Sequence, residues 1–94
     1  MNTTGRNVAL AEQRREPRRP AGGMVHLSIG NPALEVVGRL LDVSDSGFRM
    51  EHSYMPLGAG QVVEFRHSHA VGRARVVWNR IQADRAETGF LLVK

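Results

Sequence analysis

The stretch from Gln61 to Trp78 (QVVEFRHSHAVGRARVVW) decides the fold class. Two runs rich in β-branched residues, Gln61–Arg66 and Ala70–Trp78, flank the polar tripeptide His67–His69, a pattern typical of a β-hairpin. Side chains alternate between the two faces of a strand. We therefore expect the small residues and the indole of the second run to face inward, namely Gly72, Ala74, Val76 and Trp78. The stretch predicts antiparallel strands with one buried face.

Similar short runs lie on both sides of this hairpin and are separated by turn residues. They are Met24–Ile29, Ala33–Val43, Gly47–His52 and Glu87–Val93. Gly38 predicts a bulge or bend within the second of these runs, and the polar segment Asn79–Ala86 predicts a loop. Six short strands joined by turns predict an antiparallel all-β barrel or sandwich. We expect its core to contain Phe48, Phe65, Trp78 and Phe90.

Length and composition narrow the class of protein. The chain has 94 residues, enough for one domain, and its 10 glycines and 4 prolines argue against a helical bundle. Without cysteine, a disulfide scaffold, a thiolate zinc site and a cysteine nucleophile are excluded. No apolar run approaches the ~18 residues that span a bilayer, and no signal peptide is visible. The expected location is the cytoplasm.

The net charge of +4 is distributed unevenly. Residues 1–20 contain five arginines and two glutamates, whereas residues 21–94 are nearly neutral. Within Arg14–Gly23 (RREPRRPAGG), Pro17 and Pro20 favour extended backbone, so we expect a flexible arm there. Residues 1–13 are expected to form a flexible tail or a short helix. All bases except Lys94 are arginine, which suits bidentate recognition of phosphates and guanine edges. The arm therefore favours an anionic partner.

Two motifs together carry a family resemblance. The arm contains Arg-x-x-x-Arg, and the segment Asp42–Gly47 (DVSDSG) has the form Asp-x-Ser-x-x-Gly. In this order, and followed by the runs Gly60–Phe65, Gly72–Arg80 and Thr88–Phe90, they resemble the PilZ family of cyclic di-GMP receptors. The resemblance covers residues 13–93. It implies a six-stranded antiparallel barrel of the split-barrel type at 24–93 and a flexible basic arm at 14–23, so that 14–94 form one domain. The family often has a helix after the last strand, but here the sequence stops at Lys94 directly after the run Glu87–Val93, so we expect little or no C-terminal helix.

The resemblance also implies a ligand and its contacts. Cyclic di-GMP is a dianion with two guanines, each offering acceptors on one edge and N–H donors on another. An arginine can donate hydrogen bonds to O6 and N7 of a guanine or to a phosphate. The Asp42 carboxylate can accept from the N–H edge of a guanine, and the Ser44 hydroxyl can donate to the ligand. Because glycine has no side chain, Gly47 would let the backbone approach the ligand closely or adopt a positive φ. The implied ligand-binding residues are Arg14, Arg18, Asp42, Ser44 and Gly47, with Arg15 and Arg19 as a competing pair in the arm.

This hypothesis describes a receptor or adaptor that signals by binding. The arm changes conformation on cyclic di-GMP and relays that state to an unidentified effector protein. The protein is expected to be a monomer or a ligand-dependent dimer, with no catalytic residues, cofactor or membrane insertion.

Two other kinds of function compete with it. The first is a protein–protein module of the same fold without nucleotide affinity. The second is a small barrel that binds RNA or DNA, which the near-neutral body and the 5% aromatic content disfavour. A metal at His67 and His69 lacks a third ligand nearby in the sequence. A Ser-His-Asp hydrolase lacks a nucleophile elbow.

Overall fold

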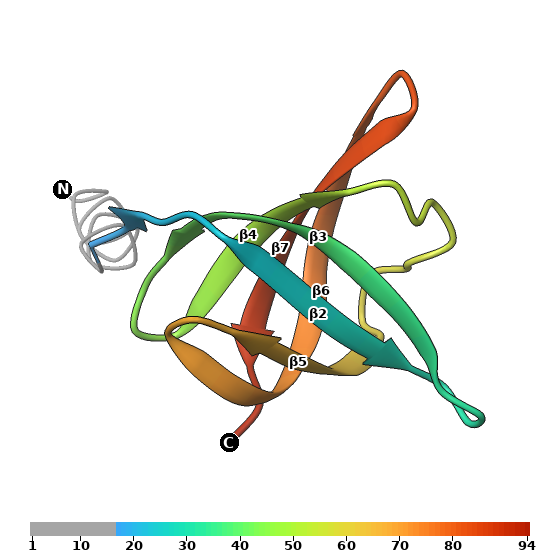
Figure 1. Cartoon of the computed structure of the whole chain (residues 1–94), viewed down its shortest axis with the longest axis horizontal. Coiled ribbons are helices and arrows are strands. Elements are labelled where there is room, and N and C mark those ends of the chain that lie inside the picture. Colours follow the sequence, from blue (N-terminus) through green and yellow to red (C-terminus); the bar gives the residue numbers. More distant parts are fainter. Residues whose placement is uncertain (1–16) are drawn as a thin grey trace, which may run out of the picture.

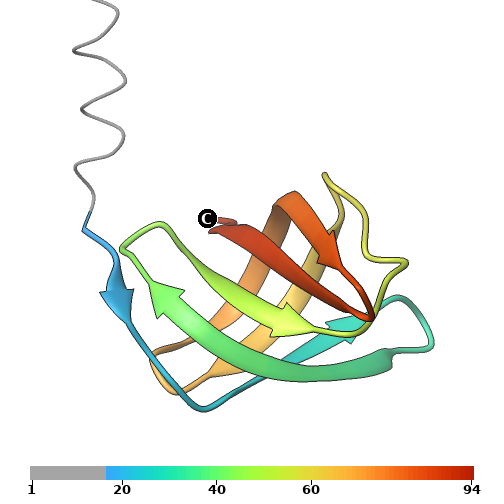
Figure 2. The same cartoon turned by 90° about the horizontal axis from the view of Figure 1, so that it is seen from above.

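The computed structural model describes residues 17–94 as an all-β protein, with no helix in that range. The strands are β1 (Arg19–Pro20), β2 (Met24–Ile29), β3 (Leu34–Val43), β4 (Gly47–His52), β5 (Val62–His67), β6 (Ala70–Gln82) and β7 (Arg85–Leu92). Six of them are neighbours in the order β3-β2-β5-β6-β7-β4, and pairing of β3 with β4 closes the ring (Figures 1 and 2). All pairs are antiparallel. The six-stranded antiparallel barrel predicted from the sequence is confirmed.

One extra strand comes from the basic arm. In β1, Arg19 pairs with Val43 and Pro20 pairs with Asp42, while Met24 of β2 pairs with Arg39 farther along the same edge of β3. The backbone between them is attached as well, since Ala21 N donates to Leu41 O at 3.1 Å. Residues 19–23 therefore continue the line of β2 along β3. The remainder of the predicted arm, residues 14–16, and the tail at 1–13 lie outside the described residues.

Aromatic rings fill the barrel at one point along its axis. Phe48 stacks on Phe90 with ring centroids 4.6 Å apart and lies against Phe65 at 4.8 Å. All three side chains are buried, as the sequence predicted. Burial of one such ring contributes about 1.5–3 kcal/mol, so this cluster is a major source of stability. The remaining core is mainly aliphatic and includes Val25, Leu27, Leu40, Met50 and Val76.

Two irregularities set which side chains face outward. In β3 the register shifts between Leu40, which pairs with Met50, and Asp42, which pairs with Arg49. Leu41 is therefore an extra residue, and the bulge turns Asp42 to the outer face while Val43 points inward. The bulge predicted at Gly38 is wrong in position. Gly38 has regular pairing, and a side chain there would meet the Glu51 carbonyl and the Met50 side chain.

A second bulge in β6 overturns the expected orientation of the indole. The register shifts between Val76, which pairs with Phe90, and Trp78, which pairs with Gly89. Val77 is the extra residue, so Val76 stays in the core while Trp78 lies on the outer face, 37% exposed. The prediction that Trp78 belongs to the core is therefore wrong. Strict alternation from Ala74 cannot anticipate the one-residue shift.

The expected loop at Asn79–Ala86 is also wrong. This segment is the far end of the β6–β7 hairpin, paired up to Gln82 and Arg85 and closed by Ala83, which has a φ of +54°, and Asp84. In Figure 1 the hairpin (orange to red) extends beyond the rest of the barrel. Residues 79–85 of this projecting ribbon are exposed on both faces and only Ala86 of the segment is buried, so the pattern of one apolar face is lost. Among the described residues, no helix is long and apolar enough to cross a bilayer.

Candidate functional site

Asp42 is the centre of a polar cluster on the outer face of the barrel. Its backbone lies between Pro20 of β1 and Arg49 of β4. Its carboxylate accepts a hydrogen bond from Arg18 Nη1 at 2.9 Å on one oxygen and from Arg49 Nε at 2.7 Å on the other. The Asp42 side chain is only 9% exposed, so both ion pairs are partly shielded from solvent. The structure thus brings the arm and the Asp-x-Ser-x-x-Gly segment together.

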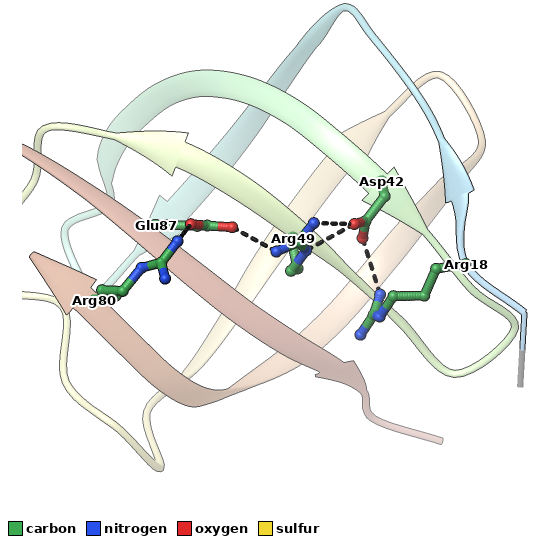
Figure 3. A network of polar contacts seen from close by, with 5 residues as sticks. All are labelled: Arg18, Asp42, Arg49, Arg80 and Glu87. Carbon is green, nitrogen blue, oxygen red and sulfur yellow. Dashed lines mark hydrogen bonds and ion pairs between the residues drawn. The ribbon is translucent and has the colours of Figure 1, made fainter. Parts of the chain in front are cut away.

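The cluster continues as a chain of alternating charges across the sheet. Arg49 Nη1 donates to Glu87 Oε2 at 2.6 Å, and Arg80 Nη2 donates to Glu87 Oε1 at 2.6 Å. In Figure 3 each carboxylate lies between two guanidinium groups. Arg18, Arg49 and Arg80 oppose two carboxylates, so the chain has a net charge of +1. The hydrogen bond from Arg49 to Asp42 raises the pKa of Arg49, although burial opposes the shift.

An exposed aromatic face lies in the same row of the sheet. Asp42 pairs with Arg49, Arg49 with Gly89, and Gly89 with Trp78, so these four residues cross β3, β4, β7 and β6 side by side. A side chain at Gly89 would collide with the indole ring. Gly89 therefore leaves room for Trp78 to lie over β7. The row offers a carboxylate edge, a guanidinium and an aromatic ring on one surface.

The turn that follows Asp42 places the other motif residues away from this face. Ser44 N donates to Gly47 O at 2.9 Å, closing the turn between β3 and β4. Ser44 is 8% exposed, and its buried hydroxyl has no hydrogen-bond partner among residues 17–94. Gly47 pairs with Leu91, and a side chain there would collide with the Phe90 carbonyl. The missing side chain of Gly47 is therefore required by close approach of β7. The φ of Gly47 is not positive, which removes one of the two reasons expected for a glycine there.

The arginines of the arm fall on different faces. Arg18 reaches Asp42 on the outer face, whereas Arg19 pairs with the inward-facing Val43 and lines a cavity together with Ser44. Adjacent residues of a strand point to opposite sides, so the two arginines cannot serve the same carboxylate. Of the two predicted arm pairs, Arg14/Arg18 and Arg15/Arg19, only the second members are described. Arg14 and Arg15 lie outside residues 17–94.

Sequence reasoning did not single out Arg49, Glu87 or Trp78 for this face. The alternation in Gly47–His52 already places Arg49 opposite Phe48 and Met50, and that signal could have identified it as outward-facing. Glu87 carries no comparable signal, because its two partners, Arg49 and Arg80, come from two other strands. The alternation in β6 gave the wrong face for Trp78.

His52 is held by a network of hydrogen bonds to residues of the protein itself. His52 is buried, and its Nδ1 accepts a hydrogen bond from Tyr54 N at 3.0 Å, so Nε2 carries the proton and donates to Thr88 Oγ1 at 2.6 Å. Thr88 in turn donates to Asn79 Oδ1 at 2.5 Å. Burial lowers the pKa of His52 and keeps the ring neutral. Within residues 17–94, no group of three acidic, histidine or cysteine side chains could hold a metal.

Comparison with known proteins adds no family assignment. No family model matches the chain, and no curated protein matches it either.

Proposed function

We propose that this protein is a cyclic di-GMP receptor whose ligand binds the outer face of β3, β4, β7 and β6. The observation that carries the proposal is the convergence of Arg18 and Asp42, 24 residues apart in the chain, beside Arg49 and in register with Trp78. These are the side-chain types that a guanine dinucleotide requires. The resemblance to the PilZ family supports the same ligand from the motifs alone.

Each group on this face has a complementary part in the ligand. The Asp42 carboxylate accepts from the N1–H and N2–H donors of one guanine, and Arg18 donates to O6/N7 or to a phosphate. The exposed indole of Trp78 offers a ring on which a base stacks, an interaction of about 1–3 kcal/mol per base. Arg49 orients the Asp42 carboxylate by its hydrogen bond to Oδ2. The net charge of +1 across the chain of charges suits an anionic ligand.

Binding changes the state of the arm in this mechanism. Without the ligand, Arg18 is engaged with Asp42. A guanine that takes the Asp42 oxygen releases Arg18, which then folds onto the ligand together with Arg14. The arm changes conformation without catalysis, and an effector protein in the cytoplasm reads that change. Ser44 and Gly47, the other two residues implied by the resemblance, lie in the turn away from this face, so the proposed contacts do not include them.

Calorimetric titration with cyclic di-GMP tests the proposal. Arg18→Ala and Asp42→Asn should each weaken binding at least tenfold while circular dichroism stays unchanged. Arg39→Ala is the matched control, because Arg39 also faces outward from β3 and pairs with Glu51 at 3.0 Å, away from Asp42. Wild-type heat of binding that survives in both site variants would refute the assignment.

The same titration separates the competing functions. A wild-type protein that binds neither cyclic di-GMP nor GTP nor a short oligonucleotide is a protein–protein module of this fold. An oligonucleotide affinity that falls steeply with salt identifies a nucleic-acid-binding barrel.

A further inference from the structure

The bulge in β6 decides whether Trp78 lies inside or outside the barrel. The register of β6 against β7 shifts by one residue between Val76 and Trp78, so Val77 is an extra residue. Without this insertion, alternation would place Trp78 on the same inner face as Val76. Hydrophobicity favours that inward position, because the indole is 37% exposed on the outer face. Other contacts must therefore hold the bulge in place.

The side chain of Asn79, the residue after Trp78, makes two such contacts on the inner side of the hairpin. Thr88 Oγ1 donates to Asn79 Oδ1 at 2.5 Å, and Asn79 Nδ2 donates to the Leu57 carbonyl at 2.8 Å. Thr88 is fully buried, and its hydroxyl already accepts from His52 Nε2 at 2.6 Å. If Asn79 turned outward, the buried hydroxyl would lose the acceptor for its own proton, which is costly.

The loop between β4 and β5 holds the bulge at both ends. Before the bulge, Gly60 N donates to the Val76 carbonyl at 2.7 Å, and Val76 N donates to the Gln61 carbonyl at 2.8 Å. After the bulge, the same loop supplies the Leu57 carbonyl that accepts from Asn79. The loop therefore fixes the positions between which the extra residue of β6 must fit.

Two features of the outer face favour the same register. A side chain at Gly89 would collide with the indole of Trp78, so the glycine leaves the space in which the ring lies. Arg80 Nη2 donates to Glu87 Oε1 at 2.6 Å. Without the bulge, Arg80 would turn to the inner side and lose this ion pair. The outward register thus gains polar contacts on both faces, whereas the register without a bulge gains burial of the indole.

We propose that Asn79 is a positioning residue whose two amide hydrogen bonds fix the bulge at Val77 and so present Trp78 on the outer face. When these bonds are lost, the β6–β7 hairpin adopts the register without a bulge, in which Trp78 pairs with Thr88 and points inward. Because Leu57 belongs to the β4–β5 loop, the position of that loop controls the exposure of the indole. This device requires no ligand, and only its effect on dinucleotide binding rests on the proposed function.

Fluorescence and NMR of the full chain test the proposal, because Trp78 is the single tryptophan. In Asn79→Ala the emission maximum should move to shorter wavelength and acrylamide quenching should fall several-fold, since the indole leaves solvent. The cross-strand NOE of Trp78 should change from Gly89 to Thr88. Gln82→Ala is the matched control, because it removes the same amide group from an exposed position of the same strand. It should keep the emission and the NOE of the wild type.

Two substitutions of Thr88 test the same contact with little change in volume. Thr88→Val removes the hydroxyl that donates to Asn79 and should shift the emission as Asn79→Ala does. Thr88→Ser keeps the hydroxyl and should keep the wild-type emission. A lower Tm in Asn79→Ala and Thr88→Val, with emission and NOE contacts unchanged, would overturn the proposal and leave Asn79 with a structural role only. An equal emission shift in Gln82→Ala would overturn it as well.

Titration with cyclic di-GMP separates this device from the proposed function. Asn79 bonds on the inner side of the hairpin, away from the proposed ligand face, so Asn79→Ala should weaken dinucleotide binding only by removing the indole, to the same extent as Trp78→Ala. If the register changes in Asn79→Ala but the wild type never binds cyclic di-GMP, the role of Asn79 stands and only the receptor function fails. If the wild type binds the dinucleotide but the register never changes, the reverse holds.

Discussion

Arg18 and Asp42 form an ion pair with an Nη1–Oδ1 distance of 2.9 Å, and the same carboxylate is held from its other side by Arg49. The two contacts differ in exposure. The Arg18 side chain is 44% exposed, whereas that of Arg49 is 33% exposed and engaged by a second carboxylate. Arg18 is therefore the member that a ligand can displace, and Arg49 is the fixed one.

Replacing Arg18 by alanine should affect binding much more than folding. Arg18 is the half-exposed member of the pair and Asp42 keeps its pair with Arg49 in this variant, so the free energy of unfolding in urea should fall by no more than about 1 kcal/mol. Affinity for cyclic di-GMP should fall at least tenfold, because a bidentate contact contributes about 1–3 kcal/mol. Calorimetry and urea unfolding on one sample measure both. A large loss of stability with unchanged affinity would make Arg18 a structural residue only.

Trp78 gives a direct optical signal for the proposed face. It is the single tryptophan of the chain, and it lies exposed in the row that contains Asp42. Stacking of a guanine should quench its fluorescence in the wild type and in Arg39→Ala, and leave it unchanged in Asp42→Asn. Trp78→Phe should retain weaker binding. Dinucleotide binding in calorimetry without any change in emission would place the ligand elsewhere.

Glu87 holds Arg49 and Arg80 together, and its side chain is only 15% exposed. Glu87→Gln should lower the free energy of unfolding by about 1–2 kcal/mol, because hydrogen bonds to charged groups are stronger than neutral ones. Glu51→Gln is the control. Glu51 also receives two arginines on the outer face, but it is more exposed and its contact with Arg85 is longer, at 3.7 Å. Equal losses of unfolding free energy in Glu87→Gln and Glu51→Gln would show that Glu87 stabilises the barrel no more than Glu51 does.

Stability should depend on pH through the buried histidines. Burial lowers the pKa values of His52 and His67 in the folded state below the unfolded value of 6.5. The unfolded chain then binds protons first as the pH falls. Stability is therefore fully present above pH ~6.5 and decreases below it, by up to about 1.4 kcal/mol per pH unit for each group.

Urea midpoints between pH 8 and pH 5 measure this dependence. His52→Gln should flatten the slope whatever its effect on absolute stability. A wild-type midpoint that rises towards pH 5 would contradict the prediction.

The sequence alone determined the barrel and part of the candidate site. Alternation of apolar and polar residues encodes which face of a strand is buried, and this pattern predicted the six strands and the aromatic core of Phe48, Phe65 and Phe90. The family resemblance carried by the two motifs predicted that the arm and the Asp42–Gly47 segment converge on one ligand, and the structure brings Arg18 and Asp42 into contact. Both inferences depend on local patterns that a single strand or turn expresses by itself.

Only the tertiary structure decided which faces meet. The bulges at Leu41 and Val77 each insert one residue, and a shift of one residue reverses the direction of every side chain that follows. For this reason Asp42 and Trp78 lie outside the barrel, although the alternation before them points inward. Likewise, pairing of β1 with β3 assigns Arg18 to Asp42 and Arg19 to the cavity of Ser44. Such choices arise from hydrogen bonds between strands distant in the chain, which no local pattern contains.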